Sequence, residues 1–579
     1  MNNKHRPVET LRSQRWYAGT DIRGFAHRQR SLQMGLRREE FMSRPVIGII
    51  NTWSDLSPCH IHLRERAEAV KRGVWQAGGY PVELPALSLG EVLVKPSTML
   101  YRNLLAMEVE ELLRSLPIDG AVLLGGCDKT TPGMLMGAIS MDIPAIFCPA
   151  GPMLNGKFRG TLVGAGTHTK IYWEERRAGN ISEADWIELE SRMTRSIGTC
   201  NTMGTASTMT SIIEAMGLTL PGASSIPAAD SGHPRMASAC GERIVGMVWE
   251  DMKLSTLLNE RAVENGVTAC MALGGSTNAA IHIIALARRA GIALTLDDLA
   301  ATARRIPVCA NLYPSGVHLM EDFFFAGGLP ALLRKLGNAI HEDCMTVNGR
   351  TLGDNIKDAM CYDDDVIRDP TQAVVPLDKG VTLAVVRGNL CPDGAVIKTS
   401  AASMHLLQHT GRALVFDNPA DMAARIDDPA SQIDENTVLV LRNAGPVGAP
   451  GMPEWGNLPI PKPLLERGVR DILRLSDGRM SGTHYGTCVL HIAPESATGG
   501  PLALLHTGDM IALDVAAGTL DMLVDEAELA LRRAAWMPPA ETYERSYGWL
   551  YKRHVNQAPD GCDFDFLAGR GGVPEPPIF

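Results

Sequence analysis

The sequence is short of several features, and each shortage excludes a class of protein. Aromatic residues make up only 5% of the 579 residues, and the longest apolar stretch, about 279–294, is interrupted by His282, Arg288 and Arg289. A membrane-spanning helix would not carry those side chains cheaply, so we expect no membrane association. Positive charge is also scarce. The formal net charge is -10, whereas nucleic acids and anionic membranes attract clustered Lys and Arg. We therefore expect a small-molecule partner and no nucleic acid.

Short cysteine spacings are absent as well. The 12 cysteines are scattered over the whole length, without the dense spacing of a secreted disulfide scaffold, so most of them should be reduced thiols. The basic residues at the start of the sequence are not followed by the apolar segment of a secretion signal. We expect a cytoplasmic protein.

The abundant residues predict a soluble α/β enzyme. Hydrophobic residues make up 45% of the chain and glycine is frequent, with 57 copies, a profile that suits many tight strand-to-helix turns. In the first half, short apolar runs alternate with amphipathic segments. The expected strands are 45–50, 81–87, 118–124 and 143–147, and the expected helices are 61–78, 98–116, 132–140 and 182–197. This alternation predicts a parallel sheet covered by helices.

The composition changes in the second half. Residues 250–345 are expected to be mainly helical, and the acidic run 363–365 suits a linker. Short β-branched runs separated by Gly, Pro and Asn follow. We therefore expect an α/β domain over 1–378 and a β-rich, barrel-like domain over 379–579, with the active site at their interface. The polar, basic residues 1–40 are expected to form an arm over the domain surface or a partner subunit.

The stretch 125–132 carries the strongest chemical signal. It places a thiol, a carboxylate and an amine on the consecutive residues Cys127, Asp128 and Lys129, between an apolar strand and a helix with proline in its first turn. Ligands bind at such crevices in parallel sheets. Cys59 and Cys200 also stand in loops just before helices, where the helix dipole favours thiolates. By spacing alone, three unrelated thiols remain as good an interpretation as a metal site.

Oxygen ligands complete the candidate set. Glu91 and Asp128 are expected to end neighbouring strands, which suits Mg²⁺, although each alone also fits a helix cap or surface acid. Lys129 fits either an ion pair or an amine that reacts with CO₂ to become an anionic ligand. Glu454 lies on a Gly/Pro-rich loop and, taken on its own, is interpreted as a solvated acid. Ser481 lies in the polar segment 473–486, which we interpret as a loop between strands, and a serine there needs a metal or oriented donors to act as a base.

Four longer strings carry a family resemblance: GGCDKTTPGMLMGA, GTCNTMGTAST, GMPEW and SDGRMSGTHYG. On these strings the chain resembles, from about Pro45 to near its C-terminus, the dihydroxy-acid and sugar-acid dehydratases. These are iron–sulfur hydro-lyases that include phosphogluconate dehydratase. The resemblance implies Ser481 as the base and Thr483 as a hydrogen-bond partner of Ser481 or of the substrate carboxylate. It also implies a [2Fe–2S] cluster on Cys59, Cys127 and Cys200, and Mg²⁺ on Glu91, Asp128, Glu454 and a carbamylated Lys129.

Two segments resemble the sugar-acid branch of the family in particular. These are Ser88-Leu-Gly-Glu91, where branched-chain biosynthetic enzymes resemble an Asp-containing loop, and the tail segment 560–566. We therefore expect dehydration of an aldonate, in particular a pentonate, to a 2-keto-3-deoxy acid. The alternatives are dihydroxy-acid dehydratase of branched-chain amino-acid biosynthesis and an iron–sulfur sensor that binds nucleic acid, which the acidic balance disfavours. The family also implies a homodimer or homotetramer.

Overall fold

The parallel sheet of the first half forms as the sequence predicts. The computed structural model describes residues 6–454 and 458–578. Its four-stranded sheet has the order β2-β1-β3-β4, and all its strands are parallel. The strands are β1 (Val46–Asn51), β2 (Tyr80–Pro85), β3 (Gly120–Gly125) and β4 (Ala145–Pro149). Every residue of β1, β3 and β4 is buried, which explains why these strands read as unbroken apolar runs.

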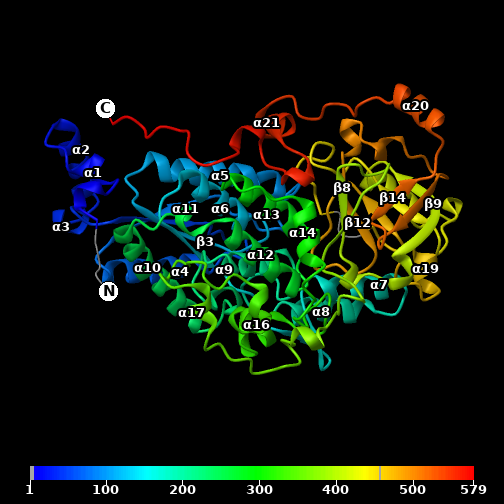
Figure 1. Cartoon of the computed structure of the whole chain (residues 1–579), viewed down its shortest axis with the longest axis horizontal. Helices are drawn as coiled ribbons and strands as arrows, with labels where there is room; N and C mark the ends of the chain where they lie inside the picture. Colours follow the sequence, from blue (N-terminus) through cyan, green and yellow to red (C-terminus); the bar gives the residue numbers. More distant parts are fainter. Residues whose placement is uncertain (1–5, 455–457, 579) are drawn as a thin grey trace.

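Two pairs of helices cover the two faces of this sheet (Figure 1). The pairs are α4 (Leu63–Gln76) with α10 (Gly232–Glu250), and α5 (Thr98–Ser115) with α6 (Thr130–Met141). Each pair meets through a glycine. A Cβ atom on Gly73 would lie 1.9 Å from the Ser238 carbonyl oxygen, and one on Gly137 would lie 2.4 Å from the Ala106 carbonyl oxygen. Only glycine therefore allows these helices to approach so closely.

The predicted helical region beyond residue 250 is confirmed. Its helices include α12 (Glu260–Ala272), α13 (Asn278–Arg289), α14 (Leu296–Ala303) and α16 (Gly328–Leu336), and they share one hydrophobic core with the sheet. The helix expected over 182–197 is shorter than predicted. As α8 (Glu183–Met193) it begins after Ser182, whose hydroxyl accepts a 3.1 Å hydrogen bond from the Asp185 amide, and it ends four residues early.

The second half forms a nearly closed barrel of eight strands, in the order β14-β13-β9-β10-β11-β12-β8-β7. They are β7 (Ala384–Val386), β8 (Gly394–Ile397), β9 (Gln408–Phe416), β10 (Val438–Leu441), β11 (Arg474–Ser476), β12 (Cys488–Ala493), β13 (Met510–Asp514) and β14 (Thr519–Met522). The two ends meet where Arg387 N donates to Gly518 O at 2.9 Å and Leu520 N donates to Arg387 O at 2.8 Å. The barrel-like domain is therefore confirmed. One detail was wrong, because residues 474–476 form β11 rather than the start of the polar loop.

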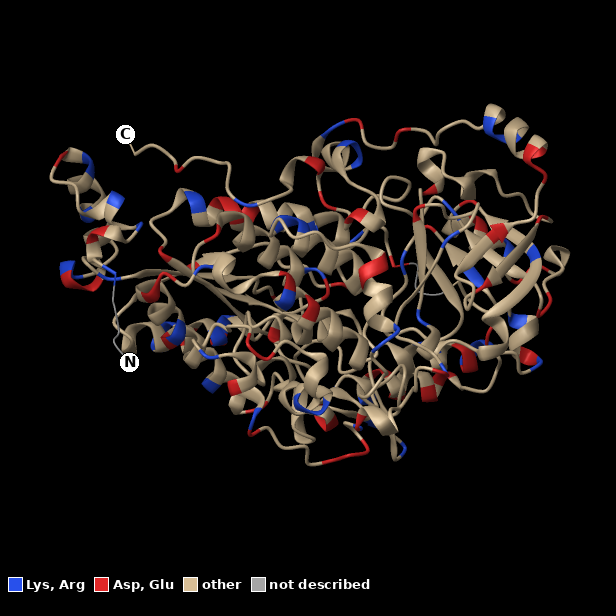
Figure 2. Cartoon of the chain, in the orientation of Figure 1, with Lys and Arg blue, Asp and Glu red and all other residues tan. Residues whose placement is uncertain are grey.

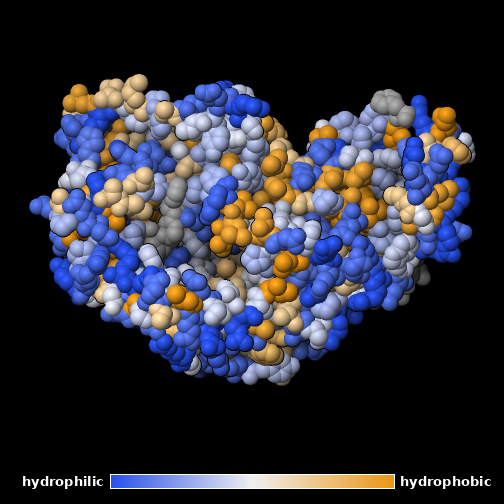
Figure 3. Space-filling view, turned by 180° about the vertical axis from the view of Figure 1, so that it is seen from behind, coloured by the Kyte–Doolittle hydropathy of each residue, from blue (hydrophilic) through white to orange (hydrophobic). Residues whose placement is uncertain are grey.

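The α/β part and the barrel lie side by side (Figure 1). Seen from behind, the upper edge of the outline is indented within the α/β part, between the N-terminal arm with the end of the tail and the rest of the molecule (Figure 3). Lys and Arg are interspersed with Asp and Glu over both lobes (Figure 2).

The N-terminal arm packs on its own domain and meets the C-terminal tail. It contains α1 (Gln14–Tyr17), α2 (Ile22–Gln33) and α3 (Arg38–Phe41), and residues 1–5 lie outside the described part of the chain. Ser13 N donates to Asp119 Oδ1 at 2.8 Å, and Arg12 Nε lies 2.7 Å from Glu575 Oε1. The tail runs from the barrel across the top of the α/β part to this arm (Figure 1).

Candidate active site

Three cysteine-bearing loops converge at the ends of the sheet strands. Cys59 lies shortly before α4, Cys127 directly after β3, and Cys200 shortly before α9 (Thr205–Ala215). A hydrogen bond with Cys127, together with burial, raises the pKa of the Cys59 thiol, and charge on Cys200 adds to the shift. Burial, followed by the charges of Asp128 and Cys127, raises the pKa of Cys200. Three thiols that stand 68 and 73 residues apart in sequence thus share one electrostatic environment.

A buried histidine orders the Cys127 loop. His60 Nδ1 contacts Ser88 Oγ at 2.9 Å, and the Cys127 amide donates to His60 Nε2 at 3.2 Å. Burial lowers the pKa of His60 to about 3, so the ring stays neutral and one nitrogen remains an acceptor. His60 therefore links the thiol loop to the Ser88–Glu91 segment.

Lys129 stands at the centre of the predicted carboxylates. Its fully buried Nζ lies 3.0 Å from Glu91 Oε2, 3.2 Å from Asp128 Oδ2 and 3.2 Å from Glu454 Oε1. The structure thus brings together all four predicted oxygen and amine ligands. The three carboxylates surround the ammonium group of Lys129. In the described ranges, no group of three His, Cys, Asp or Glu side chains is arranged as a ready metal site. The carboxylate oxygens around Lys129 are hard donors of the kind that suits Mg²⁺, and the thiols beside them are donors of the kind that suits iron.

The strand order behind one pair of these ligands differs from the prediction. Glu91 and Asp128 were expected to end neighbouring strands, but Glu91 follows β2 and Asp128 follows β3, and β1 lies between these two strands. The side chains still meet, because the loop after β2 runs on for several residues before α5 begins at Thr98. The Thr98 hydroxyl donates to Glu91 and orients that carboxylate.

Arg479 and Asn278 belong to the same cluster, and sequence analysis did not identify either. Arg479 Nη1 lies 2.5 Å from Glu454 Oε1, and Asn278 Nδ2 donates to the same oxygen at 2.9 Å. Burial alone would raise the pKa of Glu454, but Lys129 and Arg479 outweigh it and lower the pKa to about 2. Burial is the largest influence at Glu91 and raises its pKa, against the lowering effect of Lys129 and with the nearby carboxylate of Glu454 acting in the same direction. Arg479 lies in the string SDGRMSGTHYG already noted, and Asn278 ends the Gly-rich segment GGSTN.

The loop between β11 and β12 presents the serine predicted as the base. Ser481 Oγ and Thr483 Oγ1 are 2.8 Å apart, and the Thr483 amide is 3.4 Å from Ser481 Oγ. The α/β part closes tightly over this pair. A Cβ atom on Gly166 would lie 2.5 Å from Thr483 Oγ1, and one on Gly482 would lie 2.2 Å from Ser276 Oγ. The Ser481 loop comes from the barrel and the thiols from the α/β part, so the site lies between the two halves.

The tail segment 560–566 acts as a structural strap. Arg289 Nε lies 2.5 Å from Asp563 Oδ2, and both side chains are almost fully buried. Arg102, also buried, donates to the carbonyl oxygens of Gly561 and Cys562 at 2.8 Å. Cys562 packs against Met452, two residues before Glu454. The tail thus supports the loop of one predicted ligand, and Trp455 of the GMPEW string lies outside the described residues.

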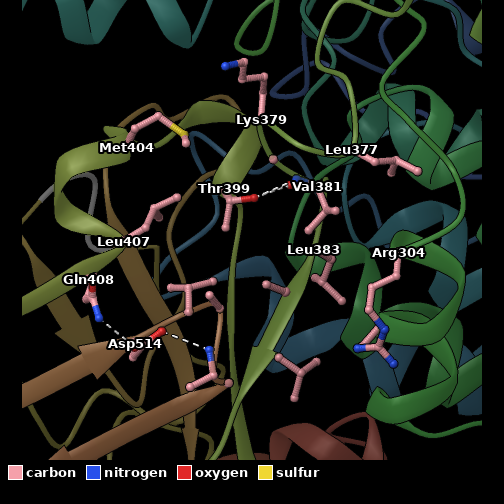
Figure 4. A pocket seen from close by; sticks show the side chains of 18 of the residues that line it. Arg304, Leu377, Lys379, Val381, Leu383, Thr399, Met404, Leu407, Gln408 and Asp514 are labelled. Atoms are coloured by element: carbon pink, nitrogen blue, oxygen red, sulfur yellow. Dashed lines mark hydrogen bonds between the residues drawn. The ribbon is translucent and has the colours of Figure 1, made fainter. Parts of the chain in front are cut away.

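A larger cavity lies away from these residues (Figure 4). It has a volume of about 560 Å³ between α14, the segment 377–385 and the turn after β13, and none of the candidate residues lines it. A cavity of about 30 Å³ lies behind Ser481, beside His484 and Lys398. We place the candidate site by the convergent thiols and carboxylates, because the large cavity has no comparable set of reactive groups. In the described part of the chain, no helix is long and apolar enough to cross a bilayer.

Comparisons with known proteins agree with this geometry. The N-terminal model of dihydroxy-acid/6-phosphogluconate dehydratase matches residues 44–355, and the C-terminal model matches 365–562. A 6-deoxy-6-sulfo-D-gluconate dehydratase of Pseudomonas putida is 67% identical, with 100% of both chains covered. An L-arabinonate dehydratase of Rhizobium leguminosarum is 50% identical over 99% of both. A dihydroxy-acid dehydratase of Pyrococcus abyssi is 38% identical, over 93% of this chain and 97% of that one. This chain therefore belongs to the dihydroxy-acid/6-phosphogluconate dehydratase family and is a dehydratase, that is, a hydro-lyase.

Proposed function

We propose that this enzyme removes water from a sugar acid and yields the 2-keto-3-deoxy acid. The observation that carries the proposal is the convergence, between the two halves of the chain, of three thiols, three carboxylates around Lys129, and the Ser481–Thr483 pair. Two relatives named for sugar acids are 67% and 50% identical, whereas a third, a D-xylonate dehydratase, is 39% identical, about as much as the dihydroxy-acid dehydratase at 38%. Branched-chain dihydroxy-acid dehydration is the second candidate.

The side chains divide into two ligand sets and one base. Cys59, Cys127 and Cys200 would hold a [2Fe–2S] cluster. Glu91, Asp128, Glu454 and a carbamylated Lys129 would hold Mg²⁺. When bound, these groups supply Lewis acidity for the enolate that develops and for the hydroxide that departs.

Ser481 takes the C2 proton in the proposed reaction. Ser481 Oγ, as the alkoxide with Thr483 Oγ1 at 2.8 Å, removes this proton, and the C2–H electron pair forms the C2=C3 bond as the C3–O bond breaks. The departing hydroxide takes the proton from Ser481 and leaves as water, which restores the alkoxide. The resulting enol tautomerises to the 2-keto acid, so the atoms balance as sugar acid going to keto acid plus water. Thr483 holds the Ser481 oxygen toward the substrate, and the closely packed Gly166 keeps Thr483 in place.

Ser481→Ala in the reconstituted holoenzyme tests the proposed base. We expect turnover to fall by roughly three or more orders of magnitude, as is usual when a reacting group is lost, while iron, sulfide and magnesium contents match the wild type. Keto-acid formation is followed by a colorimetric assay. Near-normal turnover would remove Ser481 from the mechanism, and four irons per chain would contradict the [2Fe–2S] assignment.

A substrate panel tests the proposed substrate class. L-arabinonate, D-xylonate, D-gluconate, 6-deoxy-6-sulfo-D-gluconate and 2,3-dihydroxy-isovalerate are compared by kcat/KM. We expect a sugar acid to be preferred, and a preference for the dihydroxy-isovalerate would reverse the assignment. The panel also tests the expected pentonate. Carbamylation of Lys129 is a separate proposal, and electron density for a bare amine in the Mg²⁺-loaded enzyme would refute it.

A further inference from the structure

Lys170 is a buried cation that the proposed chemistry does not use. It belongs to α7 (Thr167–Arg177) of the α/β part, which packs against α19 (Lys462–Glu466) of the second half. Its Nζ atom is shielded from solvent and has no hydrogen-bond partner in residues 6–454 and 458–578, although the residue as a whole is only partly buried. A buried ammonium group without a partner is costly. Such a group points to a ligand.

The register of α7 places Lys170 against the Ser481 loop. One turn before it, Thr167 Oγ1 donates to the Thr483 carbonyl oxygen at 2.7 Å. One turn after it, Glu174 accepts a hydrogen bond from the Tyr485 hydroxyl. Residues three and four apart lie on the same helix face. Lys170 therefore lies on the face of α7 that follows Thr483, His484 and Tyr485 along the loop.

The charges around Lys170 place it at the edge of the candidate site. Burial lowers its pKa to about 8, and the next contribution comes from Glu454, which raises it. Lys170 in turn helps to keep the pKa of His484 well below its usual range, after the larger effect of burial. The charged and titratable groups that act on Lys170 or respond to it are Glu454, Cys488, Arg474, Cys200 and His484. Arg474 is already paired with Asp471 at 2.8 Å, which leaves Lys170 as the unpaired cation of this set.

We propose that Lys170 determines substrate specificity by binding a sulfonate group at the end of the sugar acid remote from its carboxylate. This inference rests on the proposed function and deepens it. The substrate carboxylate is assigned to Mg²⁺, so a further cation without a partner in the described residues, beside the Ser481 loop, fits a second anion on the substrate. The relative that is 67% identical is named for 6-deoxy-6-sulfo-D-gluconate, a sugar acid with such a group.

A sulfonate fits one ammonium group better than a phosphate ester does. A sulfonate carries one negative charge, which a single lysine neutralises, whereas a phosphate carries close to two at pH 7. Because the structure describes one unpaired cation, Lys170, in the set of charges around it (residues 6–454 and 458–578), a buried phosphate would keep an uncompensated charge. The site should therefore prefer a sulfonated over a phosphorylated six-carbon acid.

The test compares three substrates that share one carbon chain: 6-deoxy-6-sulfo-D-gluconate, 6-phospho-D-gluconate and D-gluconate. The variants are Lys170→Met, Lys170→Arg and a control, Lys398→Met. Lys398 is a second buried lysine near the Ser481 loop, but its Nζ already donates to the Gly274 carbonyl oxygen at 2.5 Å. Binding of each compound is also measured by calorimetry, independently of turnover.

We expect Lys170→Met to lower kcat/KM and affinity for the sulfonated acid by roughly 30- to 1,000-fold, the range for losing one partner of a buried charge pair. D-gluconate should change by less than about 3-fold, since it makes no such pair, and Lys170→Arg should restore part of the loss. Lys398→Met should change both substrates by the same factor. For the wild type, kcat/KM with the sulfonated acid should fall above pH 8, where Lys170 loses its proton, while the D-gluconate profile lacks this step.

Equal losses on the sulfonated acid and D-gluconate would overturn the inference, and so would a sulfonate preference that survives in Lys170→Met. A wild-type preference for 6-phospho-D-gluconate would overturn the choice of sulfonate. Failure of the proposed function gives a different result, namely a wild-type holoenzyme that dehydrates none of the sugar acids in the panel.

Discussion

The buried ion pair that holds the C-terminal tail permits a sharp prediction, because an exposed pair of the same type stands beside it. Arg289 and Asp563 have side-chain exposures of 0% and 4%, and they form two hydrogen bonds, of 2.5 and 3.0 Å. The neighbouring pair, Arg288 and Asp560, is 36% and 55% exposed. The perturbation is Asp563→Asn, with Asp560→Asn as the matched control.

The expected losses of stability differ because only Asp563→Asn leaves a buried charge, that of Arg289, without its partner. Removing one partner of a buried ion pair costs about 3–5 kcal/mol, whereas exposed pairs contribute about 0–1 kcal/mol. Glu110 lies 3.8 Å from Arg289 and keeps part of the compensation, so we take about 3 kcal/mol for Asp563→Asn. Opening of the tail should therefore become about 100-fold more frequent in Asp563→Asn, and less than about 5-fold more frequent in Asp560→Asn.

Native-state hydrogen exchange of the peptides that cover residues 546–567 measures this opening without requiring two-state unfolding of the whole chain. Faster exchange should also appear around Met452, which contacts Cys562. Equal exchange in the two variants, or less than 5-fold acceleration in Asp563→Asn, would refute the reasoning.

Two further predictions concern pH and backbone strain. Burial raises the pKa of Glu495 to about 7, so its stabilising contribution is complete below about pH 4 and is lost as the pH rises through 7. Between pH 5 and pH 8, the free energy of unfolding of Glu495→Gln, obtained from urea midpoints, should rise relative to that of the wild type by about 3 kcal/mol. A difference between the two proteins that stays constant over this pH range would contradict the prediction. Gly166→Ala should lower kcat at least about 10-fold, because the new methyl group meets Thr483 and misplaces a group near the chemistry. Gly160→Ala has a similar positive φ but nothing within 4 Å, so equal kcat losses in these two variants would disprove the steric explanation.

The sequence predicts the parts of this molecule whose signals are local. The buried strands β1, β3 and β4 are continuous apolar runs, and the three cysteine loops precede helices, so both were found. β8, β11 and β14 have only three or four residues each, too few to show a period, and they depend on neighbouring strands for their hydrogen bonds. The order of β1 between β2 and β3 was missed for the same reason, since strand order is not a local property.

The candidate site shows the same division. Residues in distinctive strings, such as Cys127 and Ser481, could be chosen from the sequence, and their roles remain predictions. Arg479 and Lys170 could not, because an arginine or a lysine is ordinary in sequence. Only the fold shows that one contacts two buried carboxylates and that the other has no partner in the described residues.

The division of the site between two halves of the chain also imposes an order in time. Cys200 precedes Ser481 by 281 residues, and a ribosome adds about 5–20 residues per second, so all three cysteine loops exist for about 15–55 s before the serine loop is made. During synthesis the thiols and the first two carboxylates therefore emerge without the barrel that later covers them. That interval is a window in which the three thiols are available to the proposed cluster while Ser481, the proposed base, is still unmade.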